Sequence, residues 1–171
     1  DAIRGYEQSI AREAQDFAIS RRRQQEDFEK SLAEVYEDGA KQVAKIEKSY
    51  AKQRERAQEQ YKDNLTKAAA HLDAMAVYEE QKRFRQQSQD AADEHDERLQ
   101  EQRDAEQESI DDLREHLEEQ RQREDEDREL QRQRTEEDHQ QQLDQLGQDY
   151  AERLEDINRH LGEERQALND S

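Results

Sequence analysis

The stretch DFAISRRRQQEDFEKSL, residues 16–32, decides how the rest of the chain is interpreted. The stretch contains two Asp-Phe pairs, Asp16-Phe17 and Asp27-Phe28, and their phenylalanines lie eleven residues apart. Between them the chain is polar and rich in Arg and Gln, which are good helix formers. An aromatic side chain that returns after eleven residues, or three helical turns, predicts one apolar stripe along a long α-helix.

The same interval continues outward from this stretch, from Tyr6 to Leu161. The template takes positions i, i+4 and i+7 of each eleven-residue unit, starts at Tyr6, and resumes one residue late at Phe84. Of the 31 large apolar side chains, 24 fall on these positions, which we call the stripe. Eleven residues over three turns, about 3.67 per turn, favours a straight or slightly right-handed helix bundle. The predicted seam between copies of the chain comprises Tyr6, Ile10, Phe17, Phe28, Leu32, Val35, Val43, Ile46, Tyr50, Tyr61, Leu65, Leu72, Phe84, Leu99, Ile110, Leu113, Leu117, Leu143, Leu146, Tyr150, Leu154, Ile157, Leu161 and Leu168.

The composition indicates why the helix would need partners. Of 171 residues, 44% are charged and 29% hydrophobic, too few apolar side chains to fill the core of a globular domain of this length. The chain is therefore either disordered or a helix stabilised by other chains. Pro is absent and only four Gly occur, which favours the helix. We predict an all-α fold: a long, nearly continuous helix with eleven-residue repeats that forms a parallel coiled coil of several chains.

The phase slip of one residue lies between Leu72 and Phe84. It is either a shift absorbed by local winding or a joint where more helices pack. Because Gly, Pro and Asn are absent there, we expect no hairpin turn. The slip divides the chain into a charge-balanced segment, residues 1–83, with 16 basic and 17 acidic residues, and an acidic segment without Lys, residues 84–171, with 12 basic and 30 acidic residues.

No catalytic, cofactor-binding or metal-binding residues are predicted. Cys is absent, the four glycines are isolated, and Ser and His are scattered along polar helix, so we expect a protein that is not an enzyme. His95 and His139 are the most suggestive positions, because other units carry Phe or Tyr there. In a symmetric bundle they would form imidazole rings that bind an anion, a metal ion or a proton. Alternatively they are polar seam residues that set the register, which we favour.

The basic triplet Arg21, Arg22 and Arg23 is followed at once by acidic residues. We expect these arginines to pair with acids one helical turn away, for example Arg22 with Glu26. The net charge of −19 and the pI near 4.7 disfavour generic binding to DNA or to an anionic membrane. No apolar run approaches the length of a membrane span.

The repeated Asp-aromatic units resemble the helical middle region of phage tail tape measure proteins. The resemblance is strongest over residues 6–65 and weaker over residues 84–171. It implies a segment of the length ruler that fills the tail tube lumen of a phage or related injection device. It also implies location in the virion, and in the host cytoplasm during assembly. The implied partners are further copies of the chain, three by analogy, and the tail tube protein, without specific nucleic acid or membrane contact. The units that carry the resemblance are Gln15-Asp16-Phe17, Glu26-Asp27-Phe28 and Gln148-Asp149-Tyr150, with Glu137-Asp138-His139 as a degenerate copy.

Two other functions share the same physical pattern. A generic cytoplasmic coiled-coil scaffold or spacer would use the same seam without a surrounding tube. A lipid-associated helix built on eleven-residue repeats usually has a wider apolar face flanked by Lys. The narrow stripe and the Lys-free second half count against that third alternative.

Overall fold

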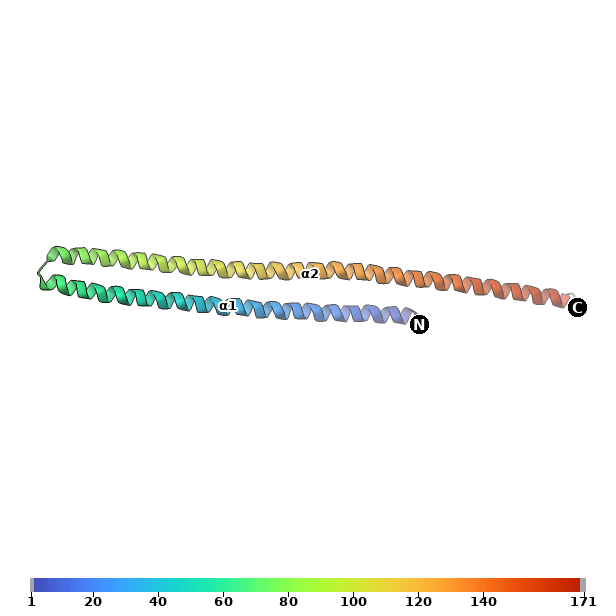
Figure 1. The fold of residues 1–171 in the computed structure, drawn as a ribbon. Coiled ribbons are helices and arrows are strands. Elements are labelled where there is room, and N and C mark those ends of the chain that lie inside the picture. The colour runs from blue at the N-terminus through green and yellow to red at the C-terminus, as the bar shows by residue number, and fades with distance from the viewer. Residues whose placement is uncertain (1, 170–171) are drawn as a thin grey trace. The chain divides into compact units, whose positions relative to one another are not determined.

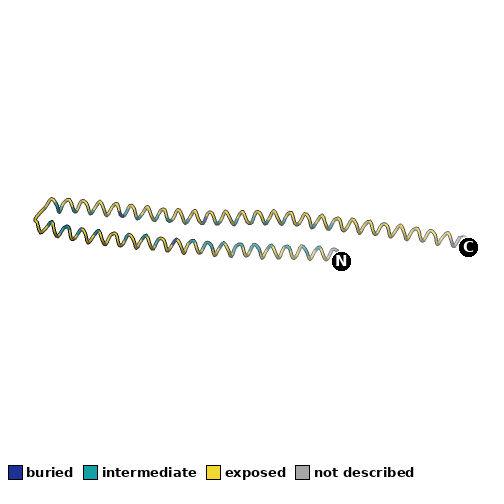
Figure 2. The backbone as a smooth tube through the Cα atoms, in the orientation of Figure 1, coloured by how far each residue is buried: buried dark blue, intermediate teal, exposed yellow. Residues whose placement is uncertain are grey.

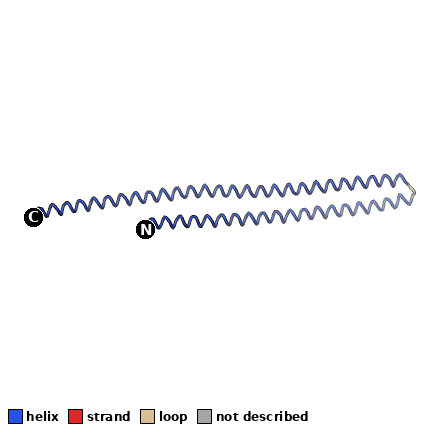
Figure 3. Tube along the Cα trace, turned by 180° about the vertical axis from the view of Figure 1, so that it is seen from behind, coloured by secondary structure: helices blue, strands red, loops and turns tan. Residues whose placement is uncertain are grey.

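The computed structural model describes the backbone of residues 2–169 and the side chains of residues 4–166. This part of the chain forms two helices and no strand: α1 (Ala2–Ala70, 69 residues) and α2 (Ala74–Asn169, 96 residues), as Figure 3 shows. The all-α prediction is confirmed. Long helices are possible here because helix-forming Gln, Glu, Arg and Ala predominate and no Pro interrupts them.

The two helices are separated by a tight turn at residues 71–73. The last turn of α1 is capped by two hydrogen bonds: the Asp73 N–H donates to the Ala68 carbonyl at 3.1 Å, and the Leu72 N–H donates to the Ala69 carbonyl at 3.0 Å. This pair of bonds is a Schellman motif, which requires a left-handed backbone at the residue after the helix. Leu72 provides it, with φ of 53°.

Asp73 then starts α2. Its carboxylate oxygen accepts a hydrogen bond from the Ala76 N–H at 3.0 Å, as an N-cap residue does, and its carbonyl accepts one from the Val77 N–H at 3.1 Å. The expectation of one nearly continuous helix without a hairpin turn is therefore wrong. A capping Asp, together with a Leu that tolerates the left-handed conformation, replaces the Gly, Pro or Asn that the sequence criterion required.

The chain divides into two units. The hairpin unit comprises Arg21–Glu118 and contains the turn. Within it, residues 21–70 of α1 lie antiparallel beside residues 74–118 of α2 (Figure 1). The terminal unit comprises Asp1–Ser20 and Glu119–Ser171. Its two segments also run antiparallel, because Tyr6 contacts His139 while Phe17 contacts Arg128.

Burial in both units is confined to one narrow face of each helix. Figure 2 shows half-buried residues recurring at helical intervals along facing sides, with exposed residues between them. Two helices can cover only a narrow seam, so the large majority of described side chains contact solvent. In the terminal unit, every residue from 140 to 166 is exposed. We call residues 140–166 the C-terminal tail.

Candidate interaction surface along the helix seam

Most stripe positions of the hairpin unit face the other helix of the same chain. Ile110 is the most deeply buried hydrophobic residue described, 5% exposed, and Ala91 on the same stripe is also buried. Fourteen large apolar residues of the predicted seam belong to this unit, and all except Leu72 are half-buried or buried: Phe28, Leu32, Val35, Val43, Ile46, Tyr50, Tyr61, Leu65, Phe84, Leu99, Ile110, Leu113 and Leu117.

Stacked ring pairs mark the register of the hairpin unit. Tyr61 stacks on Phe84 with ring centroids 4.2 Å apart and an interplanar angle of 14°. Tyr50 stacks on His95, also at 4.2 Å, with an angle of 25°. Eleven residues separate the two tyrosines on α1, and eleven residues separate Phe84 from His95 on α2. The first position of a unit in α1 thus meets the first position of a unit in α2.

This register explains the slip of one residue at Phe84. The stripe intervals of four, three and four residues read the same in both directions along the chain. After the turn, the stripe therefore resumes at the position where stripe residues of α2 lie opposite stripe residues of the antiparallel α1. The phase of the stripe in α2 is set by this pairing with α1, and not by continuation of the stripe along a single helix. The predicted boundary between residues 83 and 84 separates segments of different charge. It does not coincide with the break between the two helices, which lies at residues 71–73.

The next position in this series is occupied by a glycine. Gly39 is buried, and a Cβ atom placed on it would collide with the carboxylate of Glu106. The Glu106 side chain thus lies over the bare backbone of Gly39. Gly39 occupies a stripe position where other units carry Phe or Tyr. Because Gly39 has no side chain, the polar side chain of Glu106 has room at this position of the seam.

The terminal unit repeats the pattern with more polar partners. Tyr6 stacks on His139 with centroids 4.2 Å apart and an angle of 9°. Phe17 lies eleven residues after Tyr6 on α1. The guanidinium of Arg128 in α2 lies 4.0 Å from the ring centroid of Phe17. This distance is typical of a cation–π contact, which an Arg makes more readily than other cations. Polar stripe positions of α2 therefore still pair with aromatic rings of α1.

Both ring nitrogens of His95 have a carboxylate partner. Its Nε2 atom lies 3.0 Å from Glu47 Oε1 and its Nδ1 atom 3.1 Å from Asp96 Oδ1. The side chain is only 12% exposed. Desolvation lowers the pKa of His95, but hydrogen bonds to Glu47 and Asp96 and their negative charges outweigh it, so the pKa is raised above 6.5. Only the protonated ring donates to both carboxylates at once.

Each seam histidine stacks on a tyrosine of α1. His95 stacks on Tyr50, and His139 stacks on Tyr6. Both imidazoles therefore lie on the half-buried face of α2. No group of three or more His, Asp or Glu side chains that could hold a metal ion occurs among the described residues.

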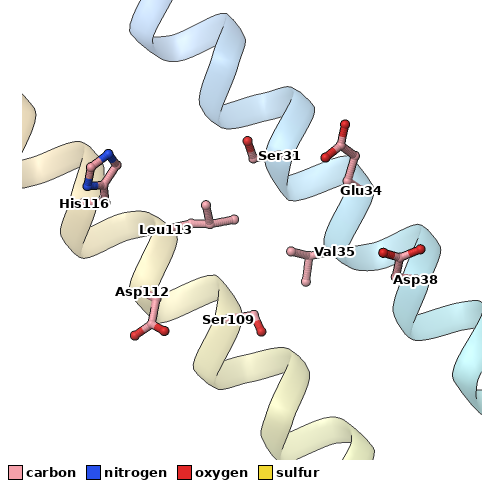
Figure 4. A pocket seen from close by; sticks show the side chains of 8 residues that line it. All are labelled: Ser31, Glu34, Val35, Asp38, Ser109, Asp112, Leu113 and His116. Carbon is pink, nitrogen blue, oxygen red and sulfur yellow. The ribbon is translucent and has the colours of Figure 1, made fainter.

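An open groove lies between the helices of the hairpin unit (Figure 4). Val35 of α1 and Leu113 of α2 point toward each other across it, while Glu34 and Asp112 point outward. The acidic groups that line the groove do not converge on a common point. The groove is thus a shallow gap in the seam and not an enclosed ligand site.

Short-range ion pairs cover the outer faces. The pair predicted for the basic triplet is confirmed: Arg22 Nε lies 3.0 Å from Glu26 Oε1. Arg98 makes a similar pair with Glu94 at 2.6 Å, also one helical turn away. Exposed pairs of this kind each contribute only about 0.3–0.5 kcal/mol, so they support the helices but do not define a site.

Other predicted seam residues lie away from the covered seam. Leu72 lies in the turn and is 93% exposed. Ile10 is 37% exposed, although its stripe neighbours Tyr6 and Glu13 are half-buried. Six further positions lie in the exposed C-terminal tail: Leu143, Leu146, Tyr150, Leu154, Ile157 and Leu161. The side chain of Leu168 falls outside the described residues.

Sequence reasoning missed two residues that position the seam. Asp73 caps α2, and its signal was present as an Asp directly before an Ala-rich helical stretch. Asn64 of α1 donates a hydrogen bond to Glu80 of α2 at 2.9 Å, next to the turn. A polar pair of this kind leaves no periodic pattern in the sequence, because its formation depends on which two helices pack together and in which register.

Comparisons with protein-family models, with curated proteins and with solved structures found no match to this chain. Among the described residues, neither helix contains a stretch apolar enough to cross a membrane.

Proposed function

We propose that the chain is a structural helical spacer that performs no chemical reaction of its own. The observation that supports this is the regular interval of the ring pairs. Tyr50 and Tyr61 of α1 meet His95 and Phe84 of α2, with the same eleven-residue step on both helices. A seam with a constant step can be lengthened or shortened by whole units while the same kinds of side chain still meet.

Within this class, we infer a segment of a phage tail tape measure as the specific function. The support is the resemblance of the repeated Asp-aromatic units, such as those that end at Phe17 and Phe28. The chain would then act in the tail lumen, with the tail tube protein around it and further copies of itself, three by analogy. Each eleven-residue helical unit corresponds to about 16 Å of length at 1.5 Å per residue.

A paired deletion tests this function. Removing residues 40–50 of α1 together with residues 95–105 of α2 takes out one unit from each helix and preserves the partners of all remaining units. Particles assembled with the shortened chain are then measured by electron microscopy. The tail should shorten by about 16 Å if the chain acts as a hairpin, and by about 33 Å if it acts as one extended helix.

Removing residues 46–50 alone provides the control, because five residues do not make a whole unit and the stripe loses its phase. Such a chain should assemble poorly and should not yield tails of a new defined length. Tails of unchanged length after the paired deletion would contradict the tape measure function, while leaving the spacer class intact.

A spacer that works without a surrounding tube is the second candidate. It is favoured because the stripe residues of the hairpin unit, such as Ile46 and Ile110, are covered by the other helix of the same chain. The purified chain should then be helical and melt cooperatively in the absence of any other protein, as measured by circular dichroism. A chain that becomes helical only with a tube protein would contradict this candidate.

A further inference from the structure

The C-terminal tail carries the stripe beyond the point where α1 covers it. In the terminal unit, His139 is half-buried against Tyr6, and from residue 140 onward every described side chain is exposed. The stripe nevertheless continues in phase through six large apolar residues whose exposed fractions lie between 39% and 67%: Leu143, Leu146, Tyr150, Leu154, Ile157 and Leu161.

The spacing of these residues is symmetric about Tyr150. Leu146 and Leu154 lie four residues on either side of it, and Leu143 and Ile157 lie seven residues on either side. An identical helix laid antiparallel, with Tyr150 as the centre, therefore places a large apolar residue opposite each of these five. The chain already uses this antiparallel pairing of stripe on stripe within the hairpin unit.

Charge along the tail is also compatible with a second copy. With about 100° per residue around the helix, the acids of residues 140–162 all lie about 100° or more from the stripe centre. Over residues 140–162, two tails would therefore keep their carboxylates away from the contact. In this range the positions that flank the stripe hold no acid, and they are Gln140, Gln142, Gly147, Arg153, Asn158 and His160. Glu164, nearer the end of the tail, lies about 40° from the stripe centre.

We propose that the C-terminal tail docks antiparallel on the tail of a second copy of this chain, with the two Tyr150 side chains opposite each other. Continuity with the seam of the terminal unit, the symmetric spacing and the absence of acids from the flanks of residues 140–162 all favour an identical helix as the occupant. The pairing goes beyond the spacer function and does not depend on a surrounding tube. It joins two chains end to end through their tails.

The first test measures mass. The full chain should approach twice its 20.5 kDa as concentration rises in sedimentation equilibrium. Replacing both Leu146 and Leu154 by Lys should weaken the association at least about tenfold, because two apolar contacts per chain are lost. The matched control places two Lys on the outer face, Gln141→Lys with Gln148→Lys, and so makes the same change in charge. This control should associate like the original chain.

The second test determines direction and register. Since the chain has no Cys, single cysteines can be introduced and joined by a short bis-maleimide that spans helices packed about 8–10 Å apart. Tyr150→Cys should cross-link to itself. Leu143→Cys and Ile157→Cys should cross-link when mixed but not separately, because like positions lie about 21 Å apart along antiparallel helices.

Three outcomes would overturn the proposal. They are a chain that stays monomeric at all concentrations, equal association of the Leu→Lys and Gln→Lys variants, and efficient cross-linking of Leu143→Cys to itself. None of these bears on the paired deletion that tests the tape measure function, so the two proposals fail independently.

Discussion

At the scale of single residues, His95 links the seam to pH. Its imidazole lies between Glu47 and Asp96 and stacks on Tyr50. The raised pKa means that the folded hairpin unit binds the proton more tightly than the unfolded chain does. The resulting stabilisation is fully present below about pH 6.5, the usual pKa of His, and is lost as pH rises through the higher folded pKa.

The corresponding prediction concerns Glu47→Gln. Removing this carboxylate should lower the pKa of His95, because one charged acceptor of the imidazolium is lost while the desolvation remains. NMR titration of the His95 ring measures this directly. Glu55→Gln, on an exposed part of the same helix, serves as the control and should leave the titration unchanged. An unchanged pKa in Glu47→Gln would show that the two side chains do not interact in solution.

Leu72 is the residue with the least favourable backbone among those described. A left-handed conformation costs a residue with a Cβ atom about 1–2 kcal/mol, whereas glycine adopts it freely. Leu72→Gly should therefore stabilise the hairpin unit by about 0.5–1 kcal/mol after the larger entropy of glycine in the unfolded chain is subtracted. Urea unfolding measures the change. Leu72→Ala, which keeps the Cβ atom, should give no such gain, and an equal gain in both variants would disprove this explanation.

At the scale of elements, the start of α2 depends on one side chain. Asp73→Ala removes the acceptor for the Ala76 N–H and should destabilise the hairpin unit by about 1 kcal/mol. Asp73→Asn keeps an acceptor at the same place and should retain nearly all of the stability. The two variants are compared by thermal unfolding, and an equal loss in both would point to the charge of Asp73 instead of its capping bond.

The elements show how far sequence patterns reach. The eleven-residue stripe correctly predicted helices, because its period depends only on helical geometry, and apart from Leu72 its large apolar residues from Phe28 to Leu117 are half-buried or buried. It could not predict that the covering helix comes from the same chain. A stripe that reads the same in both directions fits parallel and antiparallel partners equally well.

The turn was missed for a local reason. Backbone hydrogen bonds from Leu72 and Asp73 close α1, and such caps need no particular side chain at Leu72. The criterion that required Gly, Pro or Asn is therefore too strict for helical hairpins. The pairings of Gly39 with Glu106 and of Phe17 with Arg128 could not be predicted either. They follow from the register between α1 and α2, and not from the sequence of either helix alone.

At the scale of the whole molecule, repulsion between like charges opposes folding. The net charge is −19, and residues 84–171 hold 30 acidic against 12 basic residues. Salt shortens the screening length from about 8 Å at 0.15 M to about 3 Å at 1 M. It should weaken this repulsion more than it weakens the exposed pairs, such as Arg22 with Glu26, which contribute little.

We therefore expect the melting temperature to rise by about 2–4 °C between 0.15 M and 1 M NaCl, equivalent to about 1 kcal/mol. Circular dichroism at increasing salt measures this shift. A variant with four exposed acids of α2 neutralised should respond less to salt; suitable changes are Glu97→Gln, Glu101→Gln, Glu108→Gln and Glu118→Gln. A melting temperature that falls with salt would show that attractive pairs dominate instead.

The turn at residues 71–73 also sets the order in which the hairpin unit folds. The Asn64–Glu80 contact closes a loop of 16 residues, whereas the Glu47–His95 contact closes one of 48. Loop-closure entropy makes the longer loop costlier by about 1 kcal/mol when neither has yet formed. Once the contact nearest the turn exists, however, each later one closes only a short additional segment. We therefore expect folding to start beside Asp73 and to proceed outward along the two helices, so that added units would lengthen the helices without a new kinetic barrier.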